Sequence, residues 1–188
     1  MLDNHRSRAV ASHVVDPVAK GLLAMRLTPA IVTVAGSAGA IAVSVLFIAQ
    51  GRFLTATLLM IPLAGADLLD GTMARLSGTT SRWGSFLDST TDRITNGAIF
   101  ASFAWWAFGE DRQLAVASLV ALVAGFVTSY ARAKAESLGI ECKVGVAERA
   151  ERVGGIMAAA GLAGLGVPYI LPATMYAIAV LTCITVWQ

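Results

Sequence analysis

The stretch Asp67–Asp92, DLLDGTMARLSGTTSRWGSFLDSTTD, places four acids between two apolar segments. Apolar residues precede it over Phe53–Ala66 and follow it over Ile94–Gly109. Each apolar run is too short to cross a bilayer, which takes about 20 residues, unless the adjoining acidic part continues the same helix. The stretch therefore predicts a hairpin of two transmembrane helices, near residues 53–75 and 84–108, with the acids at one end.

The whole chain has the composition of an integral membrane protein. Of its 188 residues, 56% are hydrophobic and 14% are charged, against about 45–50% and 25% in soluble domains. A disordered chain is excluded, because such chains are polar and rich in charge. The net charge of +2 lacks the basic excess of nucleic-acid-binding proteins. We expect one membrane domain over residues 1–188 and no nucleic-acid partner.

Long runs without charge predict the other helices. Such runs indicate helices near residues 30–50 and 112–136, and a final run is divided by Pro168 and Pro172 into two more. The N-terminal residues 1–28 mix apolar and charged side chains and predict an amphipathic helix lying in the membrane interface. The expected fold is all-α, with this interfacial helix followed by six transmembrane helices, near residues 30–50, 53–75, 84–108, 112–136, 148–167 and 172–188.

The distribution of basic residues predicts the orientation in the membrane. Twelve of the fourteen lysines and arginines lie in the N-terminal segment, the 75–93 connection and the 132–152 connection. Only Arg52 and Arg112 lie on the opposite side. By the positive-inside rule, both termini and these two connections face the cytoplasm, so we expect a multi-pass protein of the cell membrane.

The four acids predict a metal site. Asp67 and Asp70 are three residues apart and share one helical face, and Asp88 and Asp92 are four apart and share a face of the next helix. Four carboxylates brought together in a low-dielectric setting repel one another, and two divalent cations would neutralise them. Ligation by carboxylates alone favours Mg²⁺ or Mn²⁺.

The residues between the acids suit a phosphate ligand. Gly71 allows a group to approach the backbone closely, and Ala74 has a small side chain on the next turn of the same helix. The guanidinium of Arg75 can form a bidentate pair with two phosphate oxygens. A cation transporter is the alternative from another functional class, since intramembrane carboxylates also mark ion paths. That alternative gives no reason for the glycine, alanine and arginine.

At this point the sequence resembles the CDP-alcohol phosphotransferase family. Its signature of eight residues at fixed spacing is matched by Asp67, Asp70, Gly71, Ala74, Arg75, Gly84, Asp88 and Asp92. The resemblance implies a homodimer of six-helix protomers, a dinuclear metal site on the four aspartates, and Asp92 as general base. It also implies CDP-diacylglycerol as the donor, bound by Ala30, Ile31, Val32, Thr33, Gly71, Ala74, Arg75, Ser81 and Gly84.

A second group of residues indicates an acceptor that carries its own phosphate. The segment SYARAKAESLG at 129–139, followed by ERAER at 148–152, gathers several cations with a hydroxyl. Attraction to anionic lipid headgroups is the plainer interpretation of any one of these cations. Both segments resemble those of actinobacterial phosphatidylinositol phosphate synthases, which implies that inositol 1-phosphate is bound by Ser129, Arg132, Lys134 and Arg152. The alternative acceptor is glycerol 3-phosphate, the substrate of phosphatidylglycerophosphate synthases.

Overall fold

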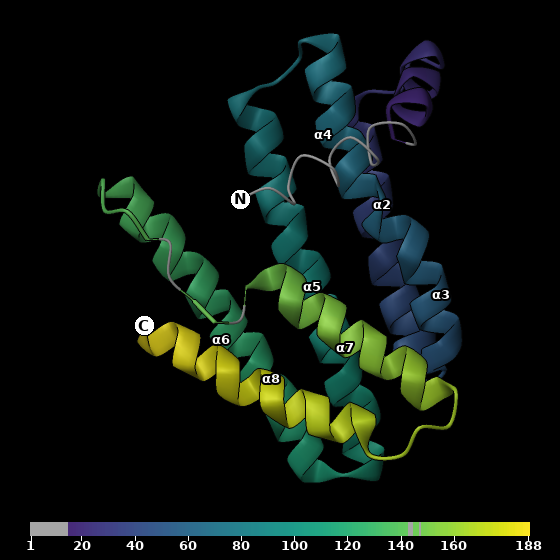
Figure 1. Cartoon of the computed structure of the whole chain (residues 1–188), viewed down its shortest axis with the longest axis vertical. Coiled ribbons are helices and arrows are strands. Elements are labelled where there is room, and N and C mark those ends of the chain that lie inside the picture. Colours follow the sequence, from purple (N-terminus) through teal and green to yellow (C-terminus); the bar gives the residue numbers. More distant parts are fainter. Residues whose placement is uncertain (1–14, 143–144, 147) are drawn as a thin grey trace, which may run out of the picture. The chain divides into compact units, whose positions relative to one another are not determined.

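The computed structural model describes residues 15–142, 145–146 and 148–188, and within these residues it is helical without strands. The N-terminal residues 1–14 of the expected interfacial segment lie outside the described part, and residues 15–24 form a helix. The remaining elements (Figure 1) are α2 (Pro29–Val43), a π-helical turn η1 (Ser44–Ile48), α3 (Phe53–Ala64), α4 (Ala66–Ser77), α5 (Arg82–Glu110), α6 (Arg112–Ser137), α7 (Arg149–Gly164) and α8 (Ile170–Trp187). The predicted all-α class is confirmed.

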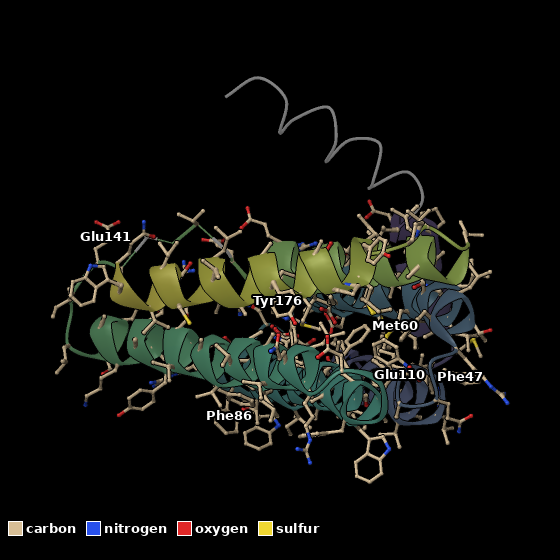
Figure 2. The ribbon with its side chains drawn as sticks, turned by 90° about the horizontal axis from the view of Figure 1, so that it is seen from below. Phe47, Met60, Phe86, Glu110, Glu141 and Tyr176 are labelled. Carbon is tan, nitrogen blue, oxygen red and sulfur yellow. The ribbon has the colours of Figure 1, made fainter. Side chains whose placement is uncertain are left out.

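Four helical segments of the described chain are long and apolar enough to cross a membrane, namely Pro29–Ile48, Phe53–Ser77, Arg112–Ser137 and Ile170–Trp187. The sixteen residues of α7 span only about 24 Å, less than the hydrocarbon core of about 30 Å. The long helix α5 begins with charged and polar residues, including Asp88 and Asp92. Glu110 and Glu141 lie at opposite ends of α6 (Figure 2), so charged residues flank this apolar helix on both sides.

The described residues form two compact units. The first contains the chain up to Ala40 together with Met60–Ile94. In it, α2 approaches the following helices through two glycines: a Cβ added at Gly36 would lie 2.7 Å from the Cβ of Ala66, and one at Gly39 would lie 2.8 Å from Leu63 Cδ2. From the first contact to the second, the residue number rises along α2 and falls along the segment Leu63–Ala66. α2 is therefore antiparallel to the segment that carries the first two aspartates.

The second unit contains Ile41–Leu59 and Thr95–Gln188, with α8 packed on α6 and α7. The start of α3 lies against α7 at very close range. A Cβ added at Gly164 would lie 2.5 Å from the backbone nitrogen of Leu54, and one at Gly161 would lie 3.0 Å from Thr57 Cγ2. The Thr57 hydroxyl also donates to the carbonyl of Met157 at 3.0 Å. The small residues of α7 therefore permit its close packing against α3 within this unit.

Candidate active site on the helical hairpin of α4 and α5

The turn between α4 and α5 is closed by its own residues. Gly78 ends α4 with a left-handed φ of 65°, a conformation that glycine adopts without strain. The Ser81 hydroxyl then accepts a hydrogen bond from the backbone N–H of Gly84 at 3.0 Å, which caps the start of α5. Ser81 and Gly84, both expected to contact the donor, therefore also shape the turn that sets the direction of α5.

The four aspartates occupy different depths on this hairpin. Asp67, in the first turn of α4, is exposed, whereas Asp70, one turn later, is only 7% exposed. Asp88 and Asp92 lie in the N-terminal part of α5 and are half-buried. The charges of Asp67 and Asp88 both act on the carboxylate of Asp70. The structure thus brings Asp70 near one carboxylate of its own helix and one of the next.

The Asp70 carboxylate has two hydrogen-bond donors. The Thr33 hydroxyl lies 2.5 Å from its Oδ2, and the backbone N–H of Gly71 also donates to it. Thr33 belongs to the segment that the family resemblance assigned to donor binding, and the structure directs its hydroxyl toward Asp70. Sequence reasoning missed this contact, because Thr33 and Asp70 are 37 residues apart and no local pattern joins them.

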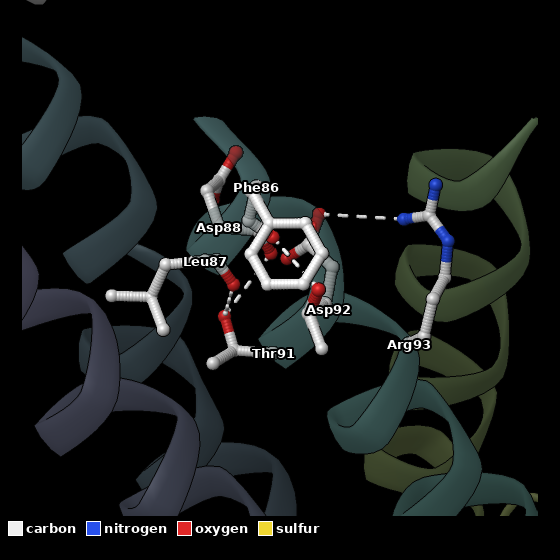
Figure 3. A network of polar contacts seen from close by, with 7 residues as sticks. Phe86, Leu87, Asp88, Thr91, Asp92 and Arg93 are labelled. Atoms are coloured by element: carbon white, nitrogen blue, oxygen red, sulfur yellow. Dashed lines mark hydrogen bonds and ion pairs between the residues drawn. The ribbon is translucent and has the colours of Figure 1, made fainter. Parts of the chain in front are cut away.

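On α5, Asp92 lies beside a cation that the sequence analysis did not single out. The Oδ2 of Asp92 is 3.9 Å from Nη1 of Arg93, a contact drawn in Figure 3. The Asp92 side chain is 13% exposed. The Thr91 hydroxyl is 2.9 Å from the carbonyl of Leu87 and turns back onto its own helix. The only available signal for Arg93 was its place directly after the last aspartate.

The donor set suits a hard divalent cation in its chemistry, because carboxylate oxygens are the preferred ligands of Mg²⁺ and Mn²⁺. Across the residues that the structure describes, no three acidic, histidine or cysteine side chains converge closely enough to hold an ion. Instead, the Asp70 carboxylate accepts from the Thr33 hydroxyl, and the Asp92 carboxylate lies 3.9 Å from Arg93.

Arg75 folds back over the small residues that precede it. Its Nη2 donates to the hydroxyl of Thr72 at 2.8 Å, and a Cβ added at Gly71 would lie 3.5 Å from its Nη1. Thr72 is 7% exposed and was not singled out from the sequence, although its spacing of three residues from Arg75 puts both on one helical face. The guanidinium is thereby held beside the backbone of Gly71, next to Asp70.

The expected acceptor residues lie in the second unit, on α6 and α7. Arg152 is only 4% exposed, and a Cβ added at Gly125 of α6 would lie 3.5 Å from its Nη2. Ser129 is half-buried one turn after Gly125. Arg132 forms ion pairs with Glu136 at 3.4 Å and with Glu148 at 3.6 Å, and Lys134 is exposed. The structure therefore places Arg152 in the interior and the other two cations at the surface.

The sequence model of the CDP-alcohol phosphatidyltransferase family matches residues 26–187. The chain belongs to this family. The matched range contains the whole aspartate hairpin and the cationic residues of α6 and α7. Membership makes the protein a transferase enzyme, which confirms the resemblance seen in the signature residues and removes the cation transporter as an alternative.

Curated relatives within the family agree in name. The chain is 41% identical to the phosphatidylinositol phosphate synthase of Streptomyces avermitilis, over 98% of this chain and 80% of that protein. It is 37% identical to the enzyme of the same name from Corynebacterium glutamicum, over 100% of this chain and 87% of that protein. The similarity therefore extends well beyond the signature, over nearly the full length.

Solved structures agree with this assignment. The crystal structure of Mycobacterium tuberculosis phosphatidylinositol phosphate synthase with CDP-DAG bound matches with a TM-score of 0.90 at 36% identity, covering 94% of this chain and 91% of that one. A structure of the same enzyme in complex with manganese and citrate also has a TM-score of 0.90, at 35% identity, covering 93% of this chain and 86% of that one. The family fold and a membrane enzyme are thus established for this chain.

Proposed function

We propose that the protein transfers the phosphatidyl group of CDP-diacylglycerol to inositol 1-phosphate, giving phosphatidylinositol phosphate and CMP. The observation that carries this proposal is the full-length similarity, at 36–41% identity, to relatives that are all named phosphatidylinositol phosphate synthase. The donor is supported by the solved relative that contains CDP-DAG. Within the chain, the aspartate hairpin supplies groups suited to a pyrophosphate, and Arg152 supplies a buried cation suited to an anionic acceptor.

Asp67, Asp70, Asp88 and Asp92 would hold two divalent cations, Mg²⁺ or Mn²⁺. Their carboxylate chemistry and the effect of Asp67 and Asp88 on Asp70 support this, as does the relative solved with manganese. When bound, such cations offset the charge of the pyrophosphate and the charge that develops on departing CMP. We expect chelation by EDTA to abolish CMP release and added Mg²⁺ or Mn²⁺ to restore it.

Within this proposal Asp92 acts as the general base. Its carboxylate accepts the proton of the acceptor hydroxyl as that oxygen forms a bond to the β-phosphorus of the donor. The bond between this phosphorus and the oxygen leading to CMP breaks, and CMP leaves. Arg75, held beside Gly71, pairs with the pyrophosphate. Further donor contacts are assigned to Ala30, Ile31, Val32, Thr33, Ala74, Ser81 and Gly84.

The acceptor phosphate is assigned to Ser129, Arg132, Lys134 and Arg152. Arg152 is the strongest member, because a buried guanidinium in a low dielectric interacts far more strongly with an anion than an exposed one does. Arg132 is already engaged by two glutamates, so a phosphate has to compete with these carboxylates for it. Glycerol 3-phosphate has the same anionic group and is the alternative acceptor.

A single assay separates the two acceptors. The purified protein is reconstituted in vesicles with CDP-diacylglycerol and Mg²⁺, and CMP release is measured with either inositol 1-phosphate or glycerol 3-phosphate. We expect release with inositol 1-phosphate that exceeds release with glycerol 3-phosphate by at least tenfold. Transfer to glycerol 3-phosphate alone would instead identify a phosphatidylglycerophosphate synthase, and release with neither acceptor would contradict both assignments.

The proposed membrane arrangement extends the four spans to six. In it, α5 and α7 also cross, the N-terminal segment 1–28 lies in the interface, and both termini face the cytoplasm. The charge distribution supports this orientation, with Arg52 and Arg112 alone on the far side. The whole chain would form one domain, and two chains would form a homodimer. Chemical cross-linking in membranes, compared with the mass of the detergent-solubilised protein, tests the dimer.

A further inference from the structure

Thr33 is a buried threonine whose hydroxyl lies within hydrogen-bond distance of two acceptor oxygens. It is 6% exposed, and its Oγ1 lies 3.1 Å from the carbonyl of Pro29, one turn back, and 2.5 Å from Oδ2 of Asp70. A hydroxyl has one proton, and an ionised acceptor forms the stronger hydrogen bond. The proton is therefore directed across to Asp70 rather than back onto α2.

The close approach of α2 to α4 holds Thr33 in this place. Gly36 lies against Ala66 and Gly39 against Leu63, at distances that leave no room for a Cβ. In the antiparallel register set by these two contacts, the residue one turn before Gly36 meets the residue one turn after Ala66. Those residues are Thr33 and Asp70. Their hydrogen bond is a consequence of backbone packing and does not depend on a flexible side chain reaching out.

The orientation of the Asp70 carboxylate is held by its surroundings. It is 7% exposed, it accepts from Thr33 and from the backbone N–H of Gly71, and it lies within the field of Asp67 and Asp88. Groups that hydrogen-bond to a metal ligand fix its orientation and strengthen metal binding. A buried carboxylate that lost its hydroxyl partner would turn to another donor and away from the neighbouring aspartates.

We propose that Thr33 is a positioning residue that orients the Asp70 carboxylate for divalent cation binding, an inference that rests on the proposed metal chemistry of this hairpin. This role is separate from the donor contact that is also assigned to Thr33. Thr33 acts through Asp70, so its removal lowers metal affinity even when no nucleotide is present.

The test measures Mn²⁺ binding to the purified full-length protein in detergent by electron paramagnetic resonance, with neither donor nor acceptor added. In Thr33→Val, which keeps the shape and removes the hydroxyl, we expect the affinity for Mn²⁺ to fall about tenfold or more. Thr33→Ser, which keeps the hydroxyl, should bind like the wild type. Thr182→Val is the matched control, because the buried Thr182 hydroxyl donates to the Ile178 carbonyl of its own helix.

Three results would overturn the proposal: unchanged Mn²⁺ affinity in Thr33→Val, an equal loss in Thr182→Val, or failure of Thr33→Ser to restore binding. Unchanged Mn²⁺ affinity with weakened CMP binding would assign Thr33 to the nucleotide instead. If Thr33→Val does not fold, as judged by its thermal unfolding, Thr33→Ala is measured in its place. A wild type that binds Mn²⁺ but releases no CMP would contradict the proposed function and leave this comparison valid.

Discussion

At the scale of single residues, the contact between Asp92 and Arg93 suits the role proposed for Asp92. The 3.9 Å between Oδ2 and Nη1 is an ion-pair distance and is too long for a hydrogen bond. Arg93 therefore offsets the charge of the carboxylate without a direct hydrogen bond to that oxygen. A general base has to turn toward the proton it accepts, and this contact permits it.

Replacement of Asp92 by asparagine is expected to remove transfer and preserve the fold. The amide cannot accept the proton of the acceptor hydroxyl, so kcat should fall by about 10²-fold or more, the contribution of a general base. CMP release measures the rate of transfer. Thermal unfolding and CDP-diacylglycerol binding show whether the fold and the donor site are preserved. Glu110→Gln, at the opposite end of α5, is the control. An active Asp92→Asn enzyme would remove the assignment of the base.

Replacement of Arg152 by alanine is expected to affect the acceptor and not the donor. Loss of a charge-assisted contact with the acceptor phosphate should raise the KM for inositol 1-phosphate by about tenfold or more, with little change in the KM for CDP-diacylglycerol. Initial rates at varied concentrations of each substrate separate the two constants. Equal increases in both would show that Arg152 supports the structure and not the acceptor.

A companion pair at Gly125 tests the same guanidinium without removing its charge. An alanine Cβ at Gly125 would lie 3.5 Å from Arg152 Nη2, which is ordinary van der Waals contact, so Gly125→Ala should behave like the wild type. Gly125→Leu would occupy the space of the guanidinium and should reproduce the selective rise in acceptor KM. A normal KM in Gly125→Leu would mean that the position of Arg152 is not critical.

At the scale of helices, glycines determine how closely segments distant in sequence approach each other. On α7, Gly161 and Gly164 admit the start of α3, and on α2, Gly36 and Gly39 admit the segment leading into α4. In lipid there is little hydrophobic driving force between apolar helices, so van der Waals packing at close range is a main source of helix association. We therefore expect these close contacts to contribute to the free energy of unfolding.

A matched pair of substitutions on α7 tests this expectation. Gly164→Ala places a Cβ 2.5 Å from the Leu54 backbone nitrogen and should cost about 1–3 kcal/mol as the helices separate. Gly154→Ala, where nothing lies within 4 Å of the new Cβ, should leave stability unchanged or raise it by about 0.5–1 kcal/mol. Thermal unfolding in one detergent ranks the variants. The opposite ranking would contradict the packing argument.

At the scale of the whole molecule, the few charged residues lie mainly at the proposed active site and in the connections from which the orientation is predicted. Only 14% of residues are charged, yet four aspartates share one helical hairpin, and twelve of the fourteen lysines and arginines lie in the N-terminal segment and the 75–93 and 132–152 connections. Charge in a membrane protein is retained where it performs a function or lies outside the bilayer. The orientation deduced from it can be tested with the two natural cysteines.

Cys142, in the connection after α6, is expected to react with a membrane-impermeant maleimide only from the cytoplasmic side. Cys142 is half-buried in a polar connection, whereas Cys183 lies in the apolar helix α8. Labelling is compared between intact cells and inverted membrane vesicles, in the Cys183→Ala background, with Cys142→Ala as the control. Labelling of intact cells would reverse the proposed orientation.

Local sequence patterns predicted the helices and the gathering of four acids on one hairpin. Apolar length, proline positions and the spacing of the four aspartates are local properties, and for this reason the predicted segments fall on helical parts of the described chain, although the segment 53–75 is divided into α3 and α4. The tertiary structure decided which side chains meet. It placed the Thr33 hydroxyl on Asp70 and the Arg152 guanidinium beside Gly125, contacts between helices far apart in sequence. Such contacts depend on the register and distance of packed helices, and no spacing within one helix encodes them.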